Sequence, residues 1–220
     1  MAEPVQPVDE LRAADRRVPG RRGRATRRRL LESTDEHLRS TPYRALKVVD
    51  IARAAGTSPA TFYQYFADVD AAVLALAREA ALDGQRLVRR VADGSWRGRA
   101  GFQAALDLTD AFLAFWDAHR PVLRVVDAGS DEGDRRFHAV RVRLLDALTA
   151  ELARVIGAVQ AHGRNLGVDP LAQAAVVVTT LAGVAAHLFA LELWGVRPAE
   201  ARLAVARQVY AGTTGQRPPS

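Results

Sequence analysis

The stretch VVDIARAAGTSPATFYQYF, residues 48–66, decides the fold because it predicts two short helices joined by a tight turn. Apolar side chains recur in its first half at the i, i+3, i+4 and i+7 spacing of one helical face. These side chains are Val48, Ile51, Ala52 and Ala55. Gly56 suits the left-handed conformation that ends a helix, and Ser58 followed by Pro59 suits the start of another. We therefore predict a helix-turn-helix.

The second predicted helix, residues 59–65, has an inward and an outward side. Phe62 and Phe66 lie four residues apart and are expected to enter the core. If it faces a major groove, Gln64 is expected to hydrogen-bond adenine. Thr61 is expected to contact a thymine methyl or a phosphate, and the tyrosine hydroxyls are expected to hydrogen-bond phosphates. The start of the helix is expected to hold another phosphate. The predicted DNA contacts of this helix are Ser58, Pro59, Ala60, Thr61, Tyr63, Gln64 and Tyr65.

An arginine-rich start precedes the motif by about 20 residues, and an all-helical remainder follows it. With this context, the motif resembles the DNA-binding domain of TetR-type bacterial repressors. The resemblance implies a three-helix DNA-binding head and a larger helical body that binds a small molecule and dimerises. It also implies that operator DNA is released when the ligand binds. The residues that carry the resemblance are Ile51, Ala52, Ala55, Gly56, Ser58, Thr61, Tyr63 and Phe66.

Three positions depart from the usual pattern of that family. Lys47 stands where a capping Ser or Thr is common, and Thr57 stands where an aliphatic residue is usual. Val69 stands where a lysine normally begins the next helix and holds a phosphate, and Asp68 and Asp70 flank it. The sequence therefore predicts that this phosphate contact comes from elsewhere, or that operator affinity is lower than is typical.

Positive charge is concentrated near the start of the chain. The 220 residues carry a net charge of +6, and the segment 12–29 alone holds nine arginines and one acid. Residues 1–23 are expected to form a disordered basic arm that follows phosphates, enters the minor groove or merely aids solubility. In the helix predicted over residues 25–38, arginines near the N-terminus oppose the helix dipole, a cost that a nearby phosphate would offset. Further predicted DNA contacts are Arg24, Arg27, Arg28 and Lys47.

The rest of the chain predicts an all-α protein. A hydrophobic content of 49% is enough for a full core. Pro121 is expected to end a helix over residues 102–119, and a short helix is expected to follow it to about residue 128. At the end of the chain, residues 211–220 are expected to fray. Further helices are expected over residues 69–93, 135–162, 171–191 and 198–210. The expected domains are a DNA-binding domain at 24–68, an effector-binding and dimerisation domain at 69–213, and a disordered tail at 214–220.

The helix over residues 102–119 carries aromatic side chains over a broad face. Such a face is either simple core or the wall of an apolar ligand pocket, in which Thr109 or His119 would supply a polar group. In the second interpretation the effector is small and apolar. The predicted pocket residues are Phe102, Leu106, Thr109, Phe112, Phe115, Trp116, His119, Phe137, Leu144, Thr180 and His187.

Residues 171–191 contain no charged side chain, and this uncharged segment is long enough to span a membrane. Polar residues recur through the segment and much of it is alanine, so we favour burial on several faces over insertion into a bilayer. Small side chains at a four-residue spacing allow close approach of another helix, and we expect this segment and the last helix to form a homodimer interface. The predicted interface residues are Ala182, Ala186, Ala190, Leu203 and Arg207.

No motif for catalysis stands out. The five histidines lack a metal-binding spacing, cysteine is absent, and the acidic loop after residue 127 lacks the residues of a calcium loop. No segment resembles a signal peptide, so we expect a cytoplasmic location. We predict a DNA-binding regulator, without cofactor or metal, that binds double-stranded operator DNA as a homodimer. A membrane-associated helical protein and a helical enzyme are the alternatives.

Overall fold

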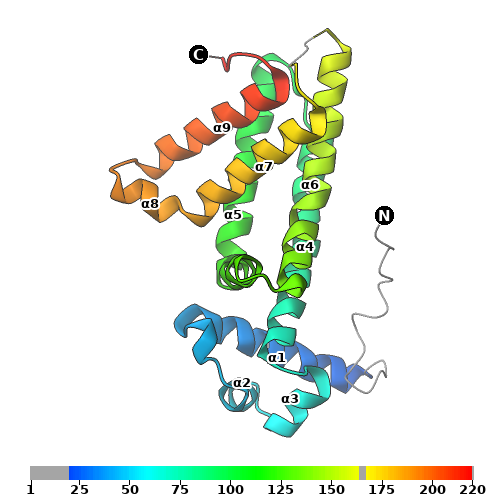
Figure 1. Ribbon diagram of the computed structural model, residues 1–220, viewed down its shortest axis with the longest axis vertical. Helices are drawn as coiled ribbons and strands as arrows, with labels where there is room; N and C mark the ends of the chain where they lie inside the picture. The colour runs from blue at the N-terminus through cyan, green and yellow to red at the C-terminus, as the bar shows by residue number, and fades with distance from the viewer. Residues whose placement is uncertain (1–19, 164–166, 220) are drawn as a thin grey trace. The chain divides into compact units, whose positions relative to one another are not determined.

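The computed structural model describes residues 20–163 and 167–219, and the regular structure within these ranges is helical (Figure 1). Of the expected basic arm, residues 1–19 lie outside the described part of the chain. The helices are α1 (Arg21–Ser40), the 3-10 turn η2 (Tyr43–Ala45), α2 (Val48–Ala54), α3 (Pro59–Tyr65), α4 (Val69–Asp93), α5 (Gly98–Asp131), α6 (Arg135–Ala161), α7 (Pro170–Ala186), α8 (Leu188–Leu193) and α9 (Pro198–Thr214).

The chain divides into two compact units. The first, which we call the head unit, comprises Met1–Glu79 and Pro121–Val140. The second, the body unit, comprises Ala80–Arg120 and Arg141–Ser220. The head unit therefore contains more than the expected DNA-binding segment 24–68, because it also includes the start of α4 and the region where α5 ends and α6 begins.

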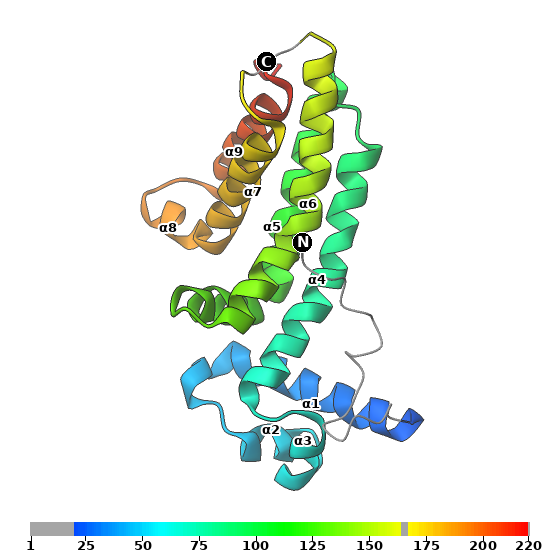
Figure 2. The same ribbon diagram turned by 45° about the vertical axis from the view of Figure 1, so that its right-hand side comes forward.

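The head unit is built around α1, α2 and α3, which lie together in both views (Figures 1 and 2). Gly56 adopts a φ of 66° in the turn between α2 and α3, as the sequence predicted. The Ser33 hydroxyl donates to the carbonyl of Ile51 at 2.9 Å and so ties α1 to α2. The buried core of the head combines large side chains with small ones: Leu30, Leu31, Ile51, Ala52, Ala55, Phe62, Phe66, Ala72 and Ala75.

Two helices extend further than the sequence predicted. α1 begins at Arg21, so residues 21–23 are helical and do not belong to an arm. α5 continues through Pro121 to Asp131, and the expected end at the proline is wrong. A proline inside a helix costs about 3 kcal/mol because it removes a backbone donor and crowds the preceding turn. Burial of the apolar side chains that follow it offsets this cost: Val122, Leu123, Val125 and Val126.

In the body unit, α7 and α9 lie side by side (Figures 1 and 2). Their approach is close at Gly212, where an added Cβ would lie 2.8 Å from Cγ2 of Val177. α9 continues to Thr214, whose side chain is buried, and the Tyr210 hydroxyl donates to the side chain of Gln216 at 2.8 Å. The expected fraying from residue 211 is therefore wrong for the end of α9.

The uncharged segment 171–191 is divided between two helices. α7 ends before His187, whose φ of −118° and ψ of 23° depart from helical values, and α8 follows it. Within residues 20–163 and 167–219, no helix is long and apolar enough to cross a bilayer.

Candidate nucleic-acid interface

α3 is fixed at its start and along its inner side. The Ser58 hydroxyl accepts a hydrogen bond from the backbone N–H of Thr61 at 3.2 Å, which satisfies one of the free donors of the first turn. Phe62 is fully buried, and its ring centroid lies 5.5 Å from that of Phe66. The two phenylalanines therefore anchor α3 in the head core, as expected from their spacing.

Fewer side chains of α3 are fully exposed than the sequence predicted. Tyr63 is 52% exposed, and Gln64 is exposed beside it, as are Pro59 and Ala60. Tyr65, by contrast, is half-buried, because it packs against the head core. The side-chain hydroxyls of Ser58 and Thr61 lie 3.0 Å apart and bond to each other, so they form part of the N-terminal cap as well as of the helix surface.

The cations near the motif have different surroundings. Arg24 and Lys47 are exposed, and Arg28 is exposed beside Glu32, 3.3 Å away on the next turn. The side chain of Arg27 is only 17% exposed, bonds to Glu79 of α4 at 3.3 Å and lies over the Phe66 ring, 5.5 Å from its centroid. Arg27 therefore fastens α1 within the head unit, and its guanidinium is less available to DNA than those of its neighbours.

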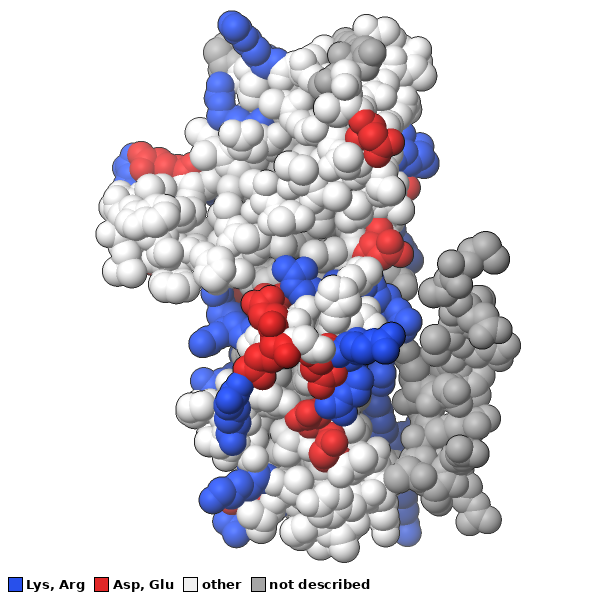
Figure 3. Space-filling model, in the orientation of Figure 1, with Lys and Arg blue, Asp and Glu red and all other residues white. Residues whose placement is uncertain are grey.

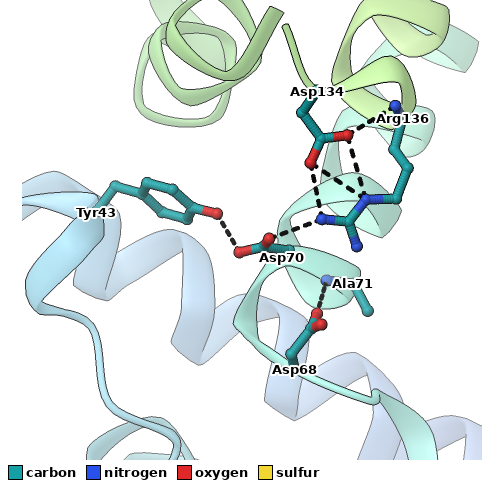
Figure 4. Close-up of polar contacts among 6 residues, drawn as sticks. All are labelled: Tyr43, Asp68, Asp70, Ala71, Asp134 and Arg136. Carbon is teal, nitrogen blue, oxygen red and sulfur yellow. Dashed lines mark hydrogen bonds and ion pairs between the residues drawn. The ribbon is translucent and has the colours of Figure 1, made fainter. Parts of the chain in front are cut away.

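The absence of a lysine at position 69 has a structural explanation. Val69 is half-buried against the head core, where a charged side chain would be costly. Asp68 caps α4 by accepting from the backbone N–H of Ala71 at 2.7 Å (Figure 4). Asp70 accepts from the Tyr43 hydroxyl and from Arg136, the latter at 2.9 Å (Figure 4). Both carboxylates next to Val69 thus have structural roles.

The contacts around Asp70 form a network that the sequence did not reveal, because its members are far apart in the chain. Tyr43 precedes α2, Asp70 lies in α4, and Arg136 lies in the first turn of α6, where it also binds Asp134 at 2.8 Å (Figure 4). Burial and the bond to Asp70 raise the pKa of Tyr43 above its ordinary range. Hydrogen bonds from Arg136 lower the pKa of Asp134 below its usual value. The network joins three segments of the head unit.

The predicted pocket residues have several different surroundings. Phe112 and Trp116 stack with their centroids 5.9 Å apart, and the Thr109 hydroxyl donates to the carbonyl of Ala105 at 2.8 Å. The remaining members have different surroundings. Phe102 packs edge-on against Tyr210, and Phe115 lies near His119, which pairs with Asp83. Phe137 lies in the head unit near Tyr43. Leu144 is buried, Leu106 is half-buried, and Thr180 and His187 are exposed.

The body unit has a pocket elsewhere, with a volume of about 450 Å³. It lies where the turn between α4 and α5 meets the last turns of α6. Its wall combines apolar groups with two arginines and a histidine: Ala92, Trp96, Arg97, Arg154, Val155, Ala158, Val159 and His162. The sequence pattern did not reveal this pocket because it is formed by a turn and a helix end rather than by an aromatic helical face.

The predicted interface residues divide between the two sides of the α7 and α9 pair. Ala182 is 2% exposed and faces the interior of the unit, whereas Leu203 and Arg207 of α9 are exposed. Ala186 and Ala190 are half-buried. The outer face of α7 is formed mostly by small and apolar residues: Ala172, Ala175, Val176, Thr179, Thr180 and Gly183. The surface over α7 and α8 is largely free of charge in Figure 3.

No cluster of histidine and acidic side chains in the described ranges has the arrangement of a metal site. The arrangement at α3, with a capped start, two anchoring phenylalanines and exposed polar and aromatic groups, matches what a helix needs to enter a major groove. It lacks the paired nucleophile and base that covalent catalysis requires.

Comparisons with solved structures agree with this fold. A protein of unknown function from Rhodococcus sp. RHA1 is 25% identical with a TM-score of 0.64, covering 85% of this chain and 94% of its own. The fatty acid degradation regulator FadR from Bacillus halodurans is 16% identical with a TM-score of 0.60, and the match covers 90% of this chain and 97% of the FadR chain. The TetR family transcriptional regulator PfmR from Thermus thermophilus is 20% identical with a TM-score of 0.53, covering 83% and 96%.

No functionally curated protein matches the sequence. Two family models do. Residues 30–81 match the bacterial regulatory proteins of the tetR family, and residues 87–220 match the tetracyclin repressor-like C-terminal domain. The second match alone spans more than half of the chain. The chain therefore belongs to the TetR family and is a DNA-binding transcriptional regulator.

Proposed function

We propose that this regulator is a repressor that binds a near-palindromic operator as a homodimer, with one α3 helix in each of two successive major grooves. The observation that carries the proposal is the division of α3 into a buried side at Phe62 and an exposed side at Tyr63 and Gln64. One such helix covers few base pairs, whereas a two-fold dimer places two of them about 34 Å apart.

Phosphate contacts in this proposal come from the exposed cations Arg24, Arg28 and Lys47. Arg27 is left out because Glu79 and the Phe66 ring already hold it. Each phosphate contact releases counterions, so operator affinity is expected to fall steeply as salt rises. Replacing Arg28 with glutamine should weaken binding similarly for all sequences and reduce the salt slope by about one.

The proposed dimer contact is the outer face of α7 and α9. This face offers small and apolar side chains at Val176, Gly183 and Leu203, which let a second pair of helices approach closely and lose apolar surface to it. Of the residues predicted from the sequence, Leu203 and Arg207 belong to this face, whereas Ala182 contributes to the packing behind it.

Release of the operator is proposed to follow binding of a small ligand with an apolar part in the body unit. The pocket beside Trp96 supports this step because its volume of about 450 Å³ suits a small molecule. α4 is one continuous helix that begins in the head unit and ends in the body unit, so a ligand that favours one arrangement of α4 would change DNA affinity. The change is limited to the ligand's preference between the two arrangements.

The test of DNA recognition is a binding titration with duplex DNA from the protein's own promoter region at moderate salt. The double variant Tyr63→Ala, Gln64→Ala should bind at least about tenfold more weakly, because each base contact is worth about 1–3 kcal/mol. Gln85→Ala is the matched control, since Gln85 is also an exposed glutamine but lies in the body unit. Equal affinities for the wild type and the double variant, with both folded, would overturn the assignment of α3.

A further inference from the structure

A second pocket, of about 490 Å³, lies within the head unit, away from α3. One wall is the end of α1 together with the Pro42–Tyr43–Arg44 corner before α2. The other wall is one face of α5, where Pro121, Arg124, Val125 and Ala128 recur at helical spacing. The lining residues are Leu38, Arg39, Ser40, Thr41, Pro42, Tyr43, Arg44, Pro121, Arg124, Val125 and Ala128.

The lining has an apolar part and a cationic part. Leu38, Pro42, Pro121 and Val125 supply aliphatic surface, and Val125 is buried. Three arginines and the hydroxyl groups of Ser40 and Thr41 supply hydrogen-bond donors, the Tyr43 hydroxyl donates to Asp70, and no carboxylate lines the pocket. Guanidinium groups bind carboxylates through paired N–H donors. The pocket therefore suits a molecule that has both an anionic group and an apolar chain.

The charges of the arginines indicate how many negative charges the pocket takes. Arg39 pairs with Asp35 at 2.7 Å, and Arg44 pairs with Glu132. Arg124 is exposed, and among the described residues no acidic side chain pairs with it. One guanidinium is thus uncompensated. The last turn of α1 also ends here, but its partial negative charge of about half a unit is smaller than the full charge of Arg124.

We propose that this head pocket binds a monoanionic small molecule with an aliphatic chain, such as a medium-chain carboxylate. Arg124 binds the carboxylate, the hydroxyls of Ser40 and Thr41 lie in the same lining, and the chain covers Leu38, Pro42 and Val125. The proposal goes beyond the function proposed above, because this pocket is separate from the one in the body unit, and its occupation does not require operator binding.

Occupation of the head pocket has a direct connection to the motif. Tyr43 and Arg44 line the pocket and lie in η2, the turn between α1 and α2, and both also bind residues outside the pocket, Asp70 and Glu132. A ligand whose carboxylate is bound by Arg124 packs its chain against this corner at Pro42. The ligand therefore acts on contacts that join the α1–α2 corner to α4 and to the turn before α6.

The test is isothermal titration calorimetry of the full chain with octanoate, at constant ionic strength and without DNA. Octanoate should bind the wild type with one site, and the uncharged octanamide should bind at least about tenfold more weakly, because charge-assisted hydrogen bonds are about twice as strong as neutral ones. Arg124→Gln should weaken octanoate binding by a similar factor. Ala128→Phe, which fills the pocket from the exposed side of α5, should abolish it.

Arg143→Gln is the matched control, because it also removes one exposed arginine but lies in the body unit. It should bind octanoate as the wild type does. Absence of octanoate binding to the wild type, or equal affinities for wild type and Arg124→Gln, would overturn the proposal. A loss of affinity for duplex DNA in Arg124→Gln with unchanged octanoate binding would also overturn it, since Arg124 would then serve the nucleic acid. The octanoate titration does not depend on DNA binding. If the α3 variants failed to affect DNA binding, the octanoate test of the head pocket would still stand.

Discussion

Two short helices, α3 in the head unit and α8 in the body unit, leave very different side chains exposed. α3 buries Phe62 completely and exposes Tyr63 and Gln64. α8 has no buried residue, and Leu193 and the following Trp194 are 81% and 78% exposed. A partner of α3 must satisfy polar groups, whereas a partner of α8 removes apolar surface from water. The two units are thus suited to different kinds of macromolecule.

The two units share two packing features. Phe62 of the head unit and Phe112 of the body unit are both fully buried. A Cβ atom added at Gly129 of the head unit, or at Gly101 or Gly212 of the body unit, would lie within 3 Å of neighbouring atoms. Removal of side-chain volume at Phe62 and addition of volume at Gly101 are therefore both expected to destabilise the protein.

The largest effect is expected from Phe62→Ala. Loss of a fully buried aromatic side chain costs about 3–5 kcal/mol, which is a large share of the stability of a small unit. Phe189→Ala is the control, because Phe189 is 58% exposed and its removal should cost less than about 1 kcal/mol. Urea unfolding followed by circular dichroism measures both variants. Similar losses in the two variants would remove the contrast between α3 and α8.

A smaller effect, of about 2 kcal/mol, is expected from Gly101→Ala in the body unit. The new Cβ would lie 2.6 Å from the backbone carbon of Trp96 and 3.1 Å from the Tyr210 ring, so backbone must shift. Gly157→Ala is the matched control within a helix of the same unit, since its Cβ would meet only Pro170 at 3.9 Å. That variant should be neutral or more stable by up to about 1 kcal/mol. Thermal unfolding of the two variants tests the prediction, which fails if Gly101→Ala is as stable as the wild type.

The smallest effect concerns the ion pair between Asp110 of α5 and Arg202 of α9. Hydrogen bonds from Arg202 lower the pKa of Asp110. A lowered pKa in the folded state stabilises the protein above the unfolded pKa of about 4, and this stability is lost as pH falls through the folded pKa. Because both side chains are more than 40% exposed, solvent screening limits the pair to about 0.5 kcal/mol.

Asp110→Asn should therefore lower the free energy of unfolding by about 0.5 kcal/mol at neutral pH and by nearly nothing at about pH 2. Asp146→Asn, which changes an exposed carboxylate on α6, serves as the control. Denaturant unfolding at several pH values provides the measurement. A difference between Asp110→Asn and the wild type that stays constant down to pH 2 would show that charge is not its cause.

The sequence by itself determined the features that depend on neighbouring residues. Gly56, Ser58 and Pro59 fixed the turn and the start of α3, and the spacing of Phe62 and Phe66 fixed its buried side. These signals act over about one helical turn, so they can be read along the chain. The all-helical class was expected from helical periodicity of the same local kind.

Only the tertiary structure decided which of several equivalent residues performs which task. Arg27 and Arg28 are adjacent, yet only Arg27 meets Glu79, which is 52 residues away. Pro121 was expected to break α5, but the burial of the residues after it keeps the helix continuous. On the aromatic face of α5, Phe112 and Trp116 are buried and stack on each other, and the pockets beside Trp96 and beside Pro121 lie where distant segments meet. Contacts of this kind depend on which elements pack together, and helical periodicity carries no information about that.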